Sequence, residues 1–175
     1  SIEFALFTPG NGQVNLIGDN NDPNIDQNDN FIVLGQDIDG DGSGANEFSL
    51  RINGDTQAPD FPALYFDQVS DLNVFGDDQN PPPGVPSAGP NDIDTLEITP
   101  WADDTPQGWG IDVFFDEGNP PGADGDQADL IILHTSLLGG QVSEDISIIP
   151  SGPDNGEIVV TNASFGTPIV DIDYV

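Results

Sequence analysis

The chain has 175 residues, of which 32 are acidic and only one, Arg51, carries a permanent positive charge, so its formal net charge is −31. Nucleic acids and anionic membrane surfaces are bound through basic patches, so this charge excludes both as partners. The absence of cysteine excludes disulfides and cysteine-ligated metals, and no stretch approaches the roughly 18 apolar residues of a membrane span.

Short alternations of apolar and polar residues run through the whole chain, whereas no window shows helical periodicity. Such alternation is typical of strands that bury one face. Asn11-Gly12, Asn53-Gly54 and Asn155-Gly156 are dipeptides of tight hairpin turns. The continuous apolar run Leu130–Leu133 predicts a strand at the centre of a sheet. The predicted strands are Ile2–Phe7, Gln13–Ile17, Asn30–Gln36, Glu47–Asn53, Ala63–Asp67, Asp71–Phe75, Ile93–Thr99, Gly110–Phe115, Asp129–Thr135, Ile146–Ile149, Glu157–Thr161 and Pro168–Tyr174.

Short strands separated by glycine- and proline-rich turns predict an all-β fold, an antiparallel, jelly-roll-like β-sandwich with long acidic calcium-binding loops. Residues 1–175 are expected to form one domain, because neither side of the long loop Gly76–Asn91 has enough strands for a core of its own. The chain opens at Ser1 directly on a strand-like segment, so we expect a mature, secreted protein whose leader has been removed.

The sharpest motif is the run of alternate aspartates that begins at Asp37 and ends at Gly42. Carboxylates at alternate positions curl round one cation, and the glycine in sixth place permits the turn that follows. Phe48 stands where an EF-hand has its closing glutamate, so we expect Glu47 to close the site. The predicted calcium ligands are Asp37, Asp39, Asp41, Ser43 and Glu47.

Two further acidic segments predict weaker calcium sites. One comprises Asp116, Asp124, Asp126 and Asp129, and the other comprises Asp19, Asp22 and Asp26. Polar loops with solvated charges are the alternative for both, and also for the first motif. Aspartate outnumbers glutamate by about four to one, which favours tight oxygen cages for Ca²⁺ over a surface adapted to high salt.

The segment from Asp37 to Gly42 resembles the DxDxDG calcium loops between strands in FG-GAP (integrin-type) and thrombospondin type 3 repeats of secreted bacterial or archaeal surface proteins. The resemblance covers about a dozen residues and implies a bound metal, not a family. The stretches NDIDTLEITPW, GIDVFFDEG and QADLIIL also resemble repeat segments of large secreted bacterial proteins. No activity follows from that likeness.

Catalytic motifs are not found in the sequence. His134 is the only histidine, and it lies beside an apolar strand without a nucleophile elbow. With so many acids, the spacing of any carboxylate pair carries no information about glycosidase chemistry. We therefore expect a protein that is not an enzyme.

The most favoured function is that of an extracellular, calcium-stabilised structural protein, a subunit of a surface assembly or filament joined by β-strand pairing. Its expected partners are copies of itself or other proteins of the cell surface. The alternative is a carbohydrate-binding or adhesion module that binds polysaccharide, because Trp101 and Trp109 are able to stack on sugar rings when they are exposed. The favoured interpretation of the two tryptophans is nevertheless that both cap the end of the sandwich core.

Overall fold

A computed structural model describes residues 6–7, 9, 12–17, 30–52, 63–75, 95–101, 108–116, 130–134, 144–152 and 155–175. These ranges contain twelve strands and no helix, and every strand overlaps one of the segments predicted as strands from the sequence. Nothing in the described part of the chain therefore has the helical length and apolarity that crossing a membrane requires.

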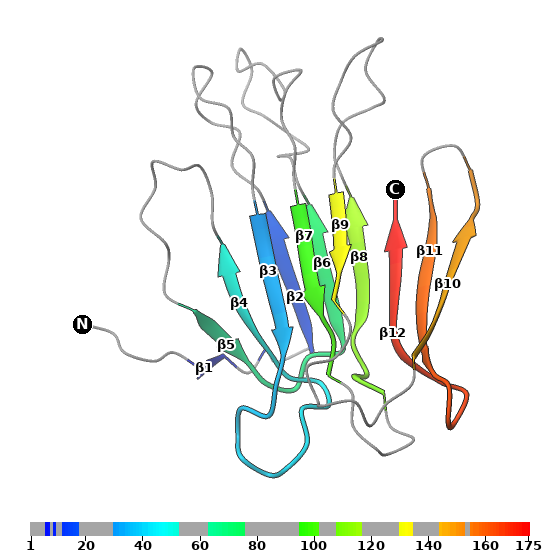
Figure 1. The fold of residues 1–175 in the computed structure, drawn as a ribbon. Coiled ribbons are helices and arrows are strands. Elements are labelled where there is room, and N and C mark those ends of the chain that lie inside the picture. Colours follow the sequence, from blue (N-terminus) through cyan, green and yellow to red (C-terminus); the bar gives the residue numbers. More distant parts are fainter. Residues whose placement is uncertain are drawn as a thin grey trace, which may run out of the picture.

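The strands form two six-stranded sheets, called sheet A and sheet B (Figure 1). Sheet A has the order β1 (Leu6–Phe7), β5 (Leu64–Phe66), β4 (Phe48–Ile52), β3 (Asn30–Gly35), β7 (Thr95–Thr99) and β9 (Leu130–Leu133). Sheet B has the order β10 (Glu144–Pro150), β11 (Gly156–Asn162), β12 (Thr167–Tyr174), β8 (Asp112–Asp116), β6 (Asp71–Phe75) and β2 (Gln13–Ile17).

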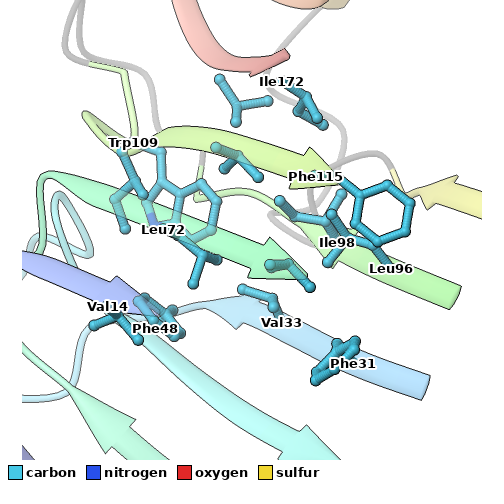
Figure 2. Close-up of a cluster of buried hydrophobic side chains, with 14 of the residues drawn as sticks. Val14, Phe31, Val33, Phe48, Leu72, Leu96, Ile98, Trp109, Phe115 and Ile172 are labelled. Carbon is cyan, nitrogen blue, oxygen red and sulfur yellow. The ribbon is translucent and has the colours of Figure 1, made fainter. Parts of the chain in front are cut away.

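One hydrophobic core joins the two sheets, because every second side chain of the central strands points inward. Figure 2 shows Phe31 and Val33 of β3 in the same cluster of buried side chains as Leu72 and Ile172 of sheet B. At one end of the core Trp109 is fully buried and meets Phe48 edge to face, with ring centroids 6.2 Å apart. Aromatic pairs of this kind add to the stabilisation from buried area.

The expectation of antiparallel sheets is wrong, because both sheets are mixed and six of the ten strand pairings are parallel. The reason is a connection that repeats three times. Strand β2 leads to β3, β6 to β7 and β8 to β9, and each step passes from sheet B to sheet A. The two strands of each such step therefore do not pair with each other, and the three units stack with their strands parallel.

The hairpin signals have different outcomes. A hairpin is confirmed near Asn155-Gly156, because β10 and β11 pair antiparallel and the carbonyl oxygen of Asn155 accepts the Ser151 N–H at 3.0 Å. The dipeptide is not itself the tight turn, because Gly156 is the first residue of β11 and pairs with Pro150. Asn11-Gly12 is wrong, because β1 and β2 lie in different sheets. The carbonyl oxygen of Gly12 instead accepts the N–H groups of Ser70 and Asp71, which directs the chain into sheet B. Asn53-Gly54 and the loop Gly76–Asn91 lie outside the described residues.

The placement of Leu130–Leu133 also differs from expectation. These residues form β9, the last described strand of sheet A, and Leu130 is 48% exposed. A continuous apolar run predicts burial on both faces, but it does not show how many strands follow in the sheet. Sheet B extends beyond this point through β12, β11 and β10, so the sheets are offset from each other (Figure 1).

Candidate metal centre

The segment 36–47 joins β3 to β4, two adjacent antiparallel strands of sheet A. Gly40 and Gly42 have φ angles of 81° and 95°, in the left-handed region that side chains with a Cβ rarely adopt. No atom lies within 4 Å of the position that a Cβ would take at either glycine. The backbone conformation, and not crowding, therefore requires glycine at both positions.

The three aspartates of this loop accept hydrogen bonds from the backbone just ahead of them. Asp37 binds the N–H groups of Gly40 and Gly42 through Oδ1 and Oδ2, at 2.7 and 2.9 Å. Asp39 Oδ1 accepts from Asp41 N at 2.9 Å, and Asp41 Oδ1 accepts from Ser43 N at 2.8 Å. These bonds fold the loop over its own carboxylates, which is the usual behaviour of aspartate in tight turns.

Each of the three aspartates offers a carboxylate oxygen, and these oxygens all lie within 4.8 Å of one another. Two ligands on one ion at metal–oxygen distances of about 2.3 to 2.6 Å are separated by at most about 5 Å. The cluster therefore has the size that one metal ion requires. It is the only such group among the residues that the structure describes.

Glu47 is 4% exposed, and its Oε2 accepts the Ile38 N–H at 2.5 Å. Burial raises the pKa of this carboxyl, and the nearby charges of Asp39 and Asp67 act in the same direction, against the lowering effect of its backbone hydrogen bonds. Glu47 is not among the residues whose oxygens lie within 4.8 Å of one another. In the structure it connects the beginning of the loop to its end.

The distal end of the loop is fixed to the core. The Trp109 indole N–H donates to the Glu47 carbonyl oxygen at 2.7 Å, and the Asn46 N–H donates to the Trp109 carbonyl oxygen at 2.7 Å. Ser43, the remaining predicted ligand, accepts the Ala45 N–H through its Oγ at 3.2 Å. The aspartates therefore stand on a loop whose end is held by buried hydrogen bonds.

The two tryptophans lie beneath this loop. Trp109 is fully buried and offers no ring face to a sugar, while Trp101 is partly buried against Gly44, where a Cβ would lie 2.5 Å from the indole Cδ2. This arrangement agrees with the interpretation of the tryptophans as caps on the end of the core. It removes one of the two side chains that motivated carbohydrate binding.

Of the other predicted ligands, Asp116 is described and forms the last residue of β8. The remaining residues of the second site, Asp124, Asp126 and Asp129, lie outside the described residues. The whole third set, Asp19, Asp22 and Asp26, lies outside them as well.

A second group of acids was not recognised from the sequence. Asp71, Asp112 and Asp171 occupy paired positions on three adjacent strands, β6, β8 and β12, and form a row on the outer face of sheet B. Desolvation raises the pKa of Asp171 to about 6, and the charges of Glu157, Asp173 and Asp112, together with a hydrogen bond to Glu157, act in the same direction. Each aspartate is visible in the sequence, but the row exists only because these strands are neighbours.

His134 lies outside both acidic groups. The Nε2 of its ring is 2.8 Å from Glu97 Oε1. Its backbone N–H donates to the carbonyl oxygen of Ile98 on the neighbouring β7. The side chain and the backbone of His134 therefore both contact strand β7 of sheet A.

No protein-family model, curated protein or solved structure matches this chain.

Proposed function

We propose that this protein is an extracellular structural domain, a β-sandwich stabilised by Ca²⁺, which serves as a subunit of a surface assembly joined by strand pairing. The observation that carries the proposal is the triad of Asp37, Asp39 and Asp41, whose oxygens lie within 4.8 Å of one another on a loop shaped by two left-handed glycines. A cation there offsets repulsion among the carboxylates of a chain with net charge −31.

Calcium is favoured over other metals by the donor set. The side chains offer only oxygen, which is the preference of hard cations, and no histidine or cysteine lies in the loop. Calcium tolerates irregular geometry and six to eight ligands, so carbonyl oxygens and water complete its shell around three aspartates. Magnesium demands near-ideal octahedral geometry and keeps most of its water, so it fits a cluster of three carboxylates on an irregular turn less well.

The open edges of the sheets support a role in assembly. Within the described part of the chain, sheet A ends on β1 and β9, and sheet B ends on β2 and β10. Edge strands present unpaired backbone groups that bind a strand from another molecule. An acidic subunit can assemble with others when its sheets have open edges for pairing and when a bound cation lowers the charge repulsion between subunits.

The test is thermal unfolding in EDTA, in Mg²⁺ and in Ca²⁺ at constant ionic strength. Calcium at about a hundredfold above its dissociation constant is expected to stabilise the folded state by about 2.7 kcal/mol. For a chain of this size, that corresponds to a rise in melting temperature of roughly 5 to 10 °C. Equal stabilisation by Mg²⁺ would contradict the preference for calcium. Stabilisation only by molar salt would show that the acids form a surface adapted to salt and would contradict the metal site.

A further inference from the structure

The two sheets are offset by half their width. The three sheet-crossing units place β3, β7 and β9 opposite β2, β6 and β8 (Figure 1). Three strands of sheet B, β12, β11 and β10, continue beyond this shared region on one side. Three strands of sheet A, β4, β5 and β1, continue beyond it on the other. We call these the B overhang and the A overhang.

The inward face of the B overhang is apolar, and it is exposed to solvent at β10, the last strand of the sheet. Ile146 and Ile148 of β10 pair with Val160 and Ile158 of β11, and the full burial of Val160 identifies this as the inward face. Yet Ile146 is 51% exposed and Ile148 is 67% exposed. Among the residues that the structure describes, no second layer therefore covers these two neighbouring isoleucines on the core side of the sheet.

The A overhang offers a matching surface. Phe48 and Leu50 of β4 belong to the core, and they pair with Phe66 and Leu64 of β5, which therefore point to the same side. Phe66 and Leu64 are only partly buried. The inward face of this overhang thus becomes less covered toward the edge of the sheet, as does that of the B overhang.

The inward faces of the two overhangs carry fewer acidic residues than the outward face of sheet B. At the inward positions of the described overhang strands, the only acid is Glu144, at the beginning of β10. The outward positions of β11 and β12, by contrast, carry Glu157, Asp171 and Asp173. In a chain with 32 acids, the two inward faces are able to approach each other without burying a row of carboxylates, which would be costly.

We propose that the A overhang of a second copy of this chain covers the B overhang of the first, so that identical subunits join head to tail into a continuous two-layered fibre. Strand β4 of one copy then lies over β10 of the next, β5 over β11 and β1 over β12. At the seams β10 adjoins β2, and β9 adjoins β1. This proposal rests on the proposed structural function. It identifies a second copy of the chain as the partner and the contact between the two overhangs, called the joint below, as the interface.

Strand direction is consistent with this joint. The pairings make β1 parallel to β9 and β10 parallel to β2, so both seams continue a parallel arrangement that already exists within each sheet. Each copy advances the fibre by six strands, or about 29 Å at 4.8 Å per strand. A head-to-tail interface that does not close into a ring generates an open filament.

The first experiment compares two variants with the same change in charge. Ile148→Asp places a carboxylate on the inward face of β10, and Ile149→Asp places one on the outward face, where Ile149 is also 50% exposed. Sedimentation and electron microscopy in millimolar Ca²⁺ are expected to show filaments for the wild type and for Ile149→Asp. For Ile148→Asp we expect loss of every species larger than the monomer. Equal polymerisation of both variants would overturn the joint.

The second experiment tests whether the contact is head to tail. The Ile148→Asp chain keeps an intact A overhang, so added to the wild type it is expected to join one end and stop growth, which shortens filaments with each addition. Leu64→Asp blocks the A overhang, and its mixture with Ile148→Asp is expected to yield dimers that neither variant forms alone. A wild type that stops at a dimer, or a mixture that stays monomeric while both variants melt cooperatively, would contradict head-to-tail association.

A third condition separates this joint from the calcium proposal. In EDTA with molar NaCl, charge repulsion is screened without a bound ion. Filaments with the same dependence on Ile148 under this condition would support the joint even if calcium failed to stabilise the monomer. A calcium-stabilised wild type that stays monomeric at high concentration in both conditions would leave the metal site intact and overturn the joint.

Discussion

Two groups of aspartates in this protein have opposite surroundings. Asp37, Asp39 and Asp41 lie on a loop whose backbone N–H groups point at their carboxylates. Asp71, Asp112 and Asp171 lie on paired strands, where the backbone N–H groups belong to the sheet. Desolvation and the neighbouring carboxylates raise the pKa of Asp171 to about 6, so this residue suits a proton. The loop aspartates instead bring three carboxylate oxygens within 4.8 Å of one another, which is the spacing that suits a cation. The element that carries a cluster of acids, a paired strand or a folded loop, therefore separates the two cases.

The largest expected effect that tests this difference comes from Asp39→Asn. The amide oxygen is able to keep the hydrogen bond from Asp41 N, but the ligand loses its charge. We expect the variant to lose most of the calcium-dependent gain of about 2.7 kcal/mol, while its stability in EDTA stays equal or rises slightly because one charge near Glu47 is gone. Melting curves in EDTA and in Ca²⁺ measure both effects. Asp112→Asn is the control and should keep the full calcium response.

The next effect is expected from Asp171→Asn and depends on pH. A carboxyl whose pKa in the folded state is raised from 3.8 to about 6 contributes stability below about pH 4 and loses that contribution as the pH rises through 6. Asparagine does not titrate, so the variant should be more stable than the wild type at pH 7.5 by about 1 to 2 kcal/mol after allowance for solvent screening.

Urea unfolding of Asp171→Asn and the wild type at pH 7.5 and near pH 4 is the measurement. The difference between the two proteins should shrink toward zero at the lower pH. A gain of the same size at both values would mean that asparagine acts through packing or hydrogen bonding, and the role assigned to charge in the row would then be wrong.

The smallest effect is expected from Gly42→Ala. An alanine at φ 95° is strained, at a cost of about 1 kcal/mol, although no neighbouring atom lies within 4 Å. Gly166→Ala is the matched control, because this glycine also has a positive φ, 67°, and open space around it. Chemical unfolding in EDTA should show similar losses for both variants. Only Gly42→Ala should also weaken the stabilisation by Ca²⁺. Equal stabilisation of both variants by Ca²⁺ would show that the conformation at Gly42 does not contribute to the metal site.

Strands were the part of the fold that sequence could predict. Alternation depends on local burial, so it located most of the described strands, including β3 with its regular pattern from Asn30 to Gly35, while a continuous apolar run located β9. The pairing of strands could not be predicted, because alternation is the same whether the next strand lies beside its predecessor or in the other sheet. One signal was present: VNLIGDNNDP and LNVFGDDQNP each place a similar acidic segment directly after β2 and β6. Repeated strand–loop segments of this kind favour stacked, parallel units.

The candidate site shows the same limit. The spacing of Asp37, Asp39 and Asp41 predicted a cluster, and the structure brings their oxygens together. Glu47 was predicted as a closing ligand from its position alone, but a buried carboxylate also satisfies backbone N–H groups, and here it binds Ile38 N. Which of these roles a side chain takes depends on the path of the loop, which Trp109 fixes from a distant part of the chain.

The position of the two tryptophans allows their intrinsic fluorescence to report on the loop that carries Asp37, Asp39 and Asp41. The chain has two tryptophans, and both contact the same loop, Trp109 through its N–H on the Glu47 carbonyl and Trp101 through its ring on Gly44. Any rearrangement of that loop changes the polarity around an indole. Intrinsic emission should therefore shift in wavelength or intensity when a cation enters, without a dye or label. Because both reporters surround one segment, a titration would follow that segment with little background from the other loops.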